Sequence, residues 1–150
     1  MSNIKLNKIF KTACIASDHA GFNLKEDIKN HLINKNISIF DIGPYHNHSV
    51  DYPDYAKKLG NRIKLKKSEV GILVCGSGTG MAISANKIKT IRAAVCYNLR
   101  STRLSRQHNN ANIIALGSRL TNKKLSLKLV EVFLKTKFAV SYTHLTLPTS

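Results

Sequence analysis

A cysteine followed by three alternating glycines is the feature of this sequence that most directly suggests chemistry. Residues 74–80 read VCGSGTG and place Cys75 at the end of an apolar run, in a chain that has only eight glycines. Glycine lets a backbone turn tightly and approach a ligand that a Cβ would exclude. Backbone N–H groups in such a turn can also form a cradle for an anion, with the thiol at its edge. The stretch therefore predicts either a structural turn or an anion site beside a reactive thiol.

This loop does not match the standard nucleotide-binding patterns. A dinucleotide fingerprint requires glycine at position 81 and a P-loop requires Gly-Lys at 81 and 82, but residue 81 is methionine. Gly76, Gly78 and Gly80 could still bind a single phosphate or an enediolate. A thiolate at a helix N-terminus is stabilised by the helix dipole and by the N–H groups there, which favours a functional Cys75 over a merely buried one.

Two further pairs of polar residues could take part in chemistry. Asp18 and His19 directly follow the first apolar run, where a carboxylate and a histidine can face a sugar hydroxyl and a phosphate. Asp18 is equally suited to capping the helix that follows. His108 and Asn109 lie in the polar stretch SRQHNNAN, where a lone histidine is more often simply solvated. Taken singly, each pair allows a structural reading as well as a functional one.

The elements that would position these residues alternate between strand and helix. Apolar, β-branched runs predict strands at 12–17, 37–43, 70–76, 92–97 and 112–117. Helical spacing of apolar residues and intervening polar segments predict helices at 22–36, 52–67, 81–88, 98–107 and 122–137. Such alternation is typical of an α/β fold with a parallel sheet, here of five strands. Because parallel strands end at one edge, we expect the polar segments that follow them to meet there.

Composition bounds the function classes. The chain has 24 Lys and Arg against 8 Asp and Glu, a formal net charge of +16, which would favour polyanions. The basic residues are spread along the whole chain and are not interleaved with aromatic ones, which argues against a dedicated nucleic-acid surface. Three cysteines without CxxC spacing suggest reduced thiols, with Cys14 and Cys96 packed in the core. With neither a signal peptide nor a membrane span in the pattern, a cytoplasmic protein is expected.

Five motifs occur together and in order: SDHAGFNLK, DYPDYA, CGSGTGMAISANK, IRAAVC and LSRQHNNANIIALGSR. In these motifs, residues 12 to about 138 resemble the ribose-5-phosphate isomerase B family, the RpiB/LacAB sugar-phosphate isomerases. The resemblance implies a single Rossmann-like three-layer sandwich that forms dimers or tetramers. It also implies interconversion of an aldose phosphate and a ketose phosphate without a metal or an organic cofactor.

The resemblance also implies roles for individual residues. Cys75 matches the base of one branch of the family, whereas the other branch uses a glutamate where this chain has Met81, whose thioether cannot take up a proton. His108 matches the acid that opens the sugar ring. The remaining matches are substrate contacts: Asp18, His19, Tyr52, Gly76, Ser77, Gly78, Thr79, Gly80, Asn109 and Arg119.

The expected course of the helix over 98–107 separates two of these roles. It runs from the ligand edge back across the sheet, so His108 should emerge at the edge opposite its own Cys75. Both can act on one sugar only if a neighbouring subunit supplies His108, which predicts a homodimer with shared sites. We expect conversion between ribose 5-phosphate and ribulose 5-phosphate. The alternatives are a galactose- or allose-6-phosphate isomerase and a non-catalytic basic module that binds nucleic acid.

The end of the chain departs from the family pattern. Positions 138–150 carry no Asp, Glu, Lys or Arg and show no helical face. We therefore expect an isomerase domain over 1–138 and a non-native or disordered tail over 139–150. The family usually carries a Gly-Gly-Arg-His stretch and further arginines after the last helix, and these are absent here, so phosphate binding would depend on His19, Arg119 and nearby lysines.

Overall fold

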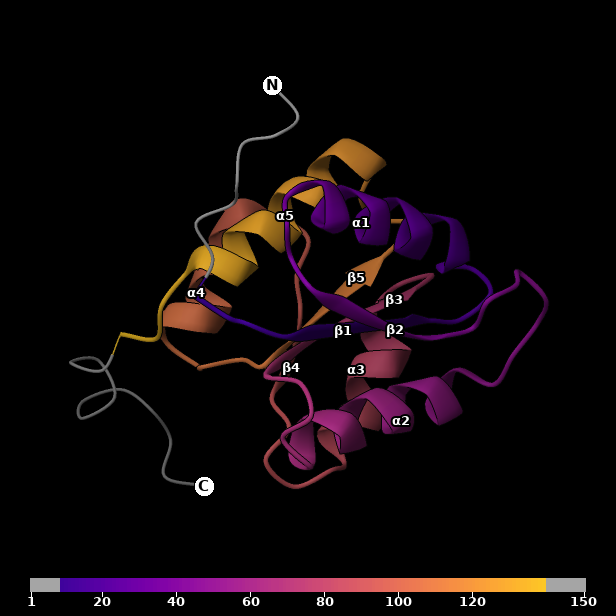
Figure 1. Ribbon diagram of the computed structural model, residues 1–150, viewed down its shortest axis with the longest axis horizontal. Helices are drawn as coiled ribbons and strands as arrows, with labels where there is room; N and C mark the ends of the chain where they lie inside the picture. The colour runs from indigo at the N-terminus through magenta and orange to yellow at the C-terminus, as the bar shows by residue number, and fades with distance from the viewer. Residues whose placement is uncertain (1–8, 140–150) are drawn as a thin grey trace.

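Five parallel strands alternate with five helices in residues 9–139, the part of the chain that the computed structural model describes (Figure 1). The strands are β1 (Ala13–Ser17), β2 (Ile39–Gly43), β3 (Val70–Cys75), β4 (Ala93–Val95) and β5 (Ile113–Gly117). The helices are α1 (Phe22–Asn34), α2 (Tyr52–Lys64), α3 (Thr79–Asn86), α4 (Leu99–Gln107) and α5 (Lys123–Lys135). The predicted Rossmann-like α/β fold is confirmed.

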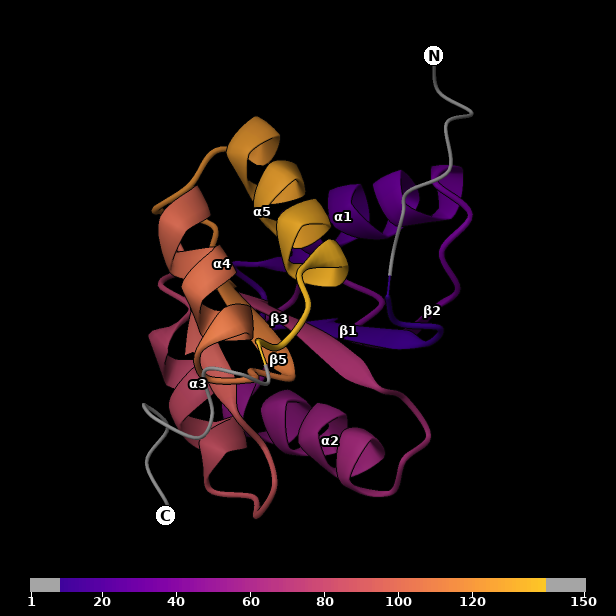
Figure 2. The same cartoon turned by 90° about the vertical axis from the view of Figure 1, so that its left-hand side faces the viewer.

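Helices cover both faces of the sheet and make three layers. Helices α1, α4 and α5 lie on one face, and α2 and α3 lie on the other (Figures 1 and 2). Each face has its own hydrophobic cluster, and the central strand β3 is buried along its whole length. That burial explains why β3 reads as a continuous apolar run rather than as an alternating one.

The order of the strands locates a crevice. The strand order is β2-β1-β3-β5-β4. After β1 the chain adds β2 on one side, and it then adds β3, β5 and β4 on the other side. In open parallel sheets, ligands bind beyond the carboxyl ends of the strands where this reversal occurs. Asp18 follows β1 and Cys75 ends β3, so the two flank the reversal.

A buried lysine holds the end of β2 and the loop that leads to α2. The Lys25 side chain has no exposed surface, and its Nζ donates to both carboxylate oxygens of Asp41, at 2.9 and 2.7 Å. Asp41 Oδ1 also accepts from the N–H of Gly43, and the Asp41 carbonyl accepts from the Tyr45 hydroxyl. This network ties α1 to the loop that precedes Tyr52.

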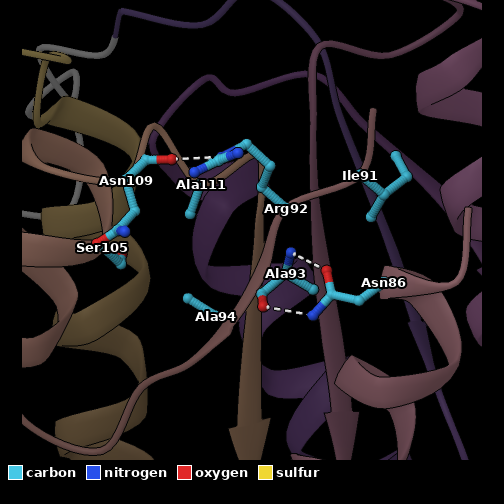
Figure 3. A pocket seen from close by; sticks show the side chains of 8 residues that line it. All are labelled: Asn86, Ile91, Arg92, Ala93, Ala94, Ser105, Asn109 and Ala111. Atoms are coloured by element: carbon cyan, nitrogen blue, oxygen red, sulfur yellow. Dashed lines mark hydrogen bonds between the residues drawn. The ribbon is translucent and has the colours of Figure 1, made fainter. Parts of the chain in front are cut away.

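Strand β4 is the outer strand on the side of the sheet away from β2. There a side chain makes the hydrogen bonds that a neighbouring strand would make. The N–H of Ala93 in β4 donates to Asn86 Oδ1 at 2.7 Å, and Asn86 Nδ2 donates to the carbonyl of Ala93 at 3.0 Å (Figure 3). Strand β4 pairs with β5 on its other side.

The tail predicted over 139–150 lies outside the described residues except for Ala139. The N–H of Ala139 donates to the carbonyl of Gln107 at 3.1 Å, which places the chain after α5 against the end of α4. Within residues 9–139, no helix combines the length and the apolar character needed to cross a membrane.

Candidate active site

A cavity of about 380 Å³ opens at the carboxyl edge of the sheet, where the strand order reverses. Its walls come from the ends of β1, β3 and β5 and from the start of α2, which are far apart in the sequence. The lining residues are Asp18, Tyr52, Cys75, Gly76, Ser77, Gly80, Arg119 and Leu120. Seven of these eight were predicted as site residues; Leu120 was missed, and its position directly after Arg119 was the only available signal.

The thiol of Cys75 sits at the N-terminus of α3, as the sequence suggested. The N–H of Gly78 donates to Cys75 Sγ at 3.0 Å. Gly78 is the N-cap of α3 and has φ 80°, in the left-handed region that favours glycine. The amide therefore directs the positive end of its dipole at the sulfur, and the start of the helix dipole adds to it, which is the arrangement that a thiolate needs.

The other two glycines of the loop make room for side chains of the cavity. A Cβ on Gly76 would lie 2.8 Å from Arg119 Nη1, and one on Gly80 would lie 2.9 Å from Tyr52 Cε1. The guanidinium and the phenol ring therefore lie directly against the glycine backbone. A cation and an aromatic hydroxyl at this distance suit an anionic, hydroxylated ligand.

Asp18 serves the local structure and also faces the cavity. It is buried, and its Oδ1 accepts from the N–H of Gly21 at 2.9 Å, one residue before α1 begins. Its own N–H donates to the carbonyl of Val74 at 3.1 Å, which ties the end of β1 to β3. His19 is exposed beside it and is not among the residues that line the cavity. Thr79 is likewise exposed at the first residue of α3.

His108 and Asn109 lie beyond the amino ends of the strands, opposite the Cys75 cavity, as the sequence predicted for His108. His108 is the C-cap of α4 and precedes β5, whose first residue Ile113 pairs with Gly71, whereas Cys75 pairs with Gly117 at the far end. The five strand residues from Ile113 to Gly117, which are four steps of the backbone, alone span about 13 Å. One chain therefore does not bring Cys75 and His108 together.

Asn109 lines a second cavity, of about 430 Å³, beside the amino end of β4 (Figure 3). Its lining residues are Asn86, Ile91, Arg92, Ala93, Ala94, Ser105, Asn109 and Ala111. Exposed Asn86 of α3, Arg92 before β4 and Asn109 after α4 thus share this open hollow with apolar residues, among them Ala93 and Ala94 of β4.

All three thiols are buried, and Cys75 belongs to the same hydrophobic cluster as Cys14, but among them only Cys75 lines the cavity at the carboxyl edge. Cys14 and Cys96 are buried in the two hydrophobic clusters, which confirms the prediction of core packing. Burial raises the pKa of the Cys14 thiol to about 11, and burial also raises the pKa of Cys96. Within residues 9–139, no group of three His, Cys, Asp or Glu side chains is arranged to hold a metal ion.

The chain is similar to known proteins over most of its length. The profile of a family described as ribose/galactose isomerase matches residues 13–146, a range that extends into the segment 139–150. The ribose-5-phosphate isomerase B of Escherichia coli is 38% identical over 128 residues, which are 85% of this chain and 86% of that protein.

Solved structures give the same result. A ribose 5-phosphate isomerase from Thermotoga maritima is 49% identical, with a TM-score of 0.84 over 85% of this chain and 88% of that one. Ribose-5-phosphate isomerase B from Mycoplasma genitalium, solved with bound ribulose-5-phosphate, is 38% identical, with a TM-score of 0.82 over 85% and 86% of the two chains.

Proposed function

The chain belongs to the ribose/galactose isomerase family, and on that premise we propose that it interconverts ribose 5-phosphate and ribulose 5-phosphate. Membership confirms the resemblance seen in the motifs and the predicted enzyme class, an isomerase. The observation that carries the proposal is the Gly78 N–H directed at Cys75 Sγ inside the cavity at the carboxyl edge.

In the proposed reaction, Cys75 is the base that moves a proton between C2 and C1. Ribose 5-phosphate is a closed furanose, so a histidine first protonates the departing ring oxygen while the C1 hydroxyl loses its proton to water. The thiolate then removes the acidified C2 proton and leaves an enediolate. The thiol returns that proton to C1, and the O2 proton moves to O1, which gives the ketose.

The glycine loop suits the anion that forms during this reaction. The charge of the enediolate develops beside Cys75, where the backbone of residues 76–80 begins α3. Amides fixed at a helix N-terminus stabilise a developing oxyanion without having to reorganise. The glycines are thus needed because the backbone must approach an intermediate closely, and they leave space for Tyr52 and Arg119 at the same time.

We assign the ring-opening acid to His108 of a second copy of the chain. Cys75 and His108 lie at opposite edges of the sheet, so an isomerase that uses both needs two chains for each site. Asn109 would enter the same shared site as a sugar ligand. Whether the assembly is a dimer or a tetramer does not alter this requirement.

We assign the phosphate to Arg119, which lines the cavity, and to His19, which is exposed beside Asp18. Arg119 is exposed, and its guanidinium lies against Gly76, where a planar cation can bind phosphate oxygens in pairs. His19 follows Asp18 at the same edge and supplies a second donor. Both residues come from loops that the strand ends hold in place.

A cysteine exchange tests the assignment of the base. Cys75→Ser should lower kcat for ribose 5-phosphate at least about a hundredfold, because a hydroxyl is a far poorer base than a thiolate. Cys96→Ser is the matched control, since that thiol is buried away from the cavity, and it should keep most of the activity. The assay runs ribose 5-phosphate, allose 6-phosphate and galactose 6-phosphate side by side. Retention of more than about a tenth of kcat in Cys75→Ser would exclude the cysteine as the base, and preference for a six-carbon substrate would exclude the pentose assignment.

A mixed assembly tests the shared site. Alone, Cys75→Ser and His108→Ala chains should each retain at most about a hundredth of the wild-type kcat, and a dimer of one chain of each kind should recover partial activity because one of its two sites is intact. Subunit exchange is verified by mass spectrometry. Verified mixed dimers without recovery would contradict the shared site.

A further inference from the structure

We propose that Arg106 is a positioning residue for His108, and that Arg92 supports the same turn from its other side. The inference deepens the proposed function, since it assumes that His108 is the ring-opening acid. Neither arginine touches the Cys75 cavity. Both form hydrogen bonds with the turn over 107–112, which carries His108 and Asn109.

The guanidinium of Arg106 connects this turn to the chain that leaves α5. Its Nη1 donates to the carbonyl of Ala111 at 2.6 Å and to Asn110 Oδ1 at 3.1 Å, and its Nε donates to the carbonyl of Thr136 at 3.0 Å. The guanidinium carbon also lies 4.8 Å from the ring centre of Phe10 and 5.7 Å from that of Phe133. One planar group thus links the turn that follows His108 to the chain that leaves α5.

The charge of Arg106 makes a purely structural explanation costly. The residue is 3% exposed, and among residues 9–139 no carboxylate lies at ion-pair distance from it. Burial lowers the pKa of the guanidinium, which shows that its surroundings disfavour the cation. Lys25, the other buried cation, has Asp41 and Glu26 as partners. Apolar residues would fill the space of Arg106 at lower cost, but they could not hold the turn.

The turn itself needs such support. The backbone at Asn110 has φ 48°, in the left-handed region, where α4 ends. The N–H of Ala111 donates to the carbonyl of Ser105 at 2.9 Å, so the chain reverses tightly after His108. Arg106 binds both residues that make the reversal, which fixes the direction in which the preceding His108 leaves the helix.

Arg92 holds the outer side of the turn. Its Nε donates to the carbonyl of Asn109 at 2.5 Å, as Figure 3 shows across the second cavity. Its backbone N–H donates to Asn112 Oδ1 at 2.8 Å, and the N–H of Asn112 donates back to the Arg92 carbonyl at 3.0 Å. The start of β4 therefore restrains the turn while Arg106 restrains it from the core.

A conservative exchange at Arg106 tests the role. Arg106→Lys keeps the charge but cannot reproduce the fork of donors, so kcat for ribose 5-phosphate should fall about tenfold while KM stays within about twofold, because a displaced acid slows the chemistry rather than binding. Arg62→Lys is the matched control. Arg62 donates from Nε to Ser68 Oγ at 2.9 Å, and its guanidinium carbon lies 3.7 Å from the ring centre of Phe40, so these contacts are with segments other than the turn, and its exchange should leave kcat unchanged.

A double-mutant cycle separates positioning from general damage to the fold. In a His108→Ala background, Arg106→Lys should lower kcat by less than about a further twofold, because the group on which it acts is gone. Additive losses would overturn the proposal. An inactive wild type or a fully active His108→Ala variant would instead refute the proposed function.

Hydrogen exchange gives a readout that is independent of activity. The amide of Ala111 should exchange at least about tenfold faster in Arg106→Lys than in the wild type, because loss of the restraint opens the turn locally. Arg62→Lys should not change that rate. Arg92→Ala, an exchange at an exposed residue that leaves the core intact, should also speed exchange at Ala111 and lower kcat severalfold. Unchanged exchange in both arginine variants would overturn the proposal whatever the activity.

Discussion

Alanine at Gly78 is expected to damage both the stability and the chemistry of the protein. Gly78 has φ 80°, where a residue with a Cβ costs about 1–2 kcal/mol. The added Cβ would also lie 3.1 Å from the carbonyl carbon of Leu116 and 3.2 Å from its oxygen. These are backbone atoms of the central sheet, which cannot move aside, so overpacking adds about 1 kcal/mol or more. The expected loss in the free energy of unfolding is about 3 kcal/mol in total.

The same exchange should lower kcat. To relieve the strain, the loop must rotate the Gly78 N–H away from Cys75 Sγ, which it now meets at 3.0 Å. Losing this donor destabilises the Cys75 thiolate that acts as the base, and a hydrogen bond to a charged group contributes about 1.5–3 kcal/mol, which corresponds to a loss of about ten- to a hundredfold in kcat. The kcat of Gly78→Ala should therefore be lower than that of the wild type by about that factor.

Gly80→Ala is the informative comparison, because its Cβ would meet a side chain rather than backbone. The nearest atoms belong to the ring of Tyr52, which is 42% exposed and can rotate. Gly80 lies within α3, where alanine is favoured over glycine by about 1 kcal/mol. Urea unfolding should show little loss of stability for Gly80→Ala and the full loss for Gly78→Ala. Equal stabilities of the two variants, or wild-type kcat in Gly78→Ala, would refute the argument.

Two further predictions concern charge and thiols. Asp41→Asn removes the main partner of the fully buried Lys25 and should cost about 3 kcal/mol at pH 7. Burial works to raise the pKa of Asp41, but hydrogen bonds from the lysines outweigh it, so the pKa is lowered. The ion pair therefore stabilises the fold above the ordinary carboxyl range, and the gap between wild type and Asp41→Asn in urea should close as the pH falls below about 4. At pH 8, iodoacetamide should modify Cys75 and abolish activity while Cys14, with a pKa of about 11, stays unmodified; peptide mapping that finds equal labelling would contradict this.

The alternation of strands and helices could be predicted from the sequence because each element has its own apolar period. Several ends of the helices could not, since single backbone conformations set them. Helix α1 ends at Asn34 and α2 at Lys64, each shortly before a residue with positive φ, Asn36 or Lys66. Helix α3 begins two residues earlier than predicted, because Gly78 itself is the N-cap.

The residues of the cavity were predictable for a different reason, namely that parallel strands deliver the segments after them to one edge. The separation of His108 from Cys75 followed from the same rule. The buried cations could not be predicted, because Lys25 and Arg106 stand in polar helical patterns where a solvated side chain is the usual outcome. Only the packing of distant segments around them shows that both are enclosed.

The side chain of Asn86 has a consequence for how these molecules behave when crowded. An outer strand presents unpaired amide and carbonyl groups on which another chain can assemble. In β4 the outward-facing N–H and carbonyl of Ala93 are already hydrogen-bonded to the side-chain amide of Asn86, which replaces one residue of a neighbouring strand. Sheets of neighbouring molecules therefore cannot join edge to edge there without first displacing that amide. The Asn86 side chain thus hinders the growth of filaments through β4. It requires only that the short helix α3 end at Asn86, within hydrogen-bond reach of Ala93.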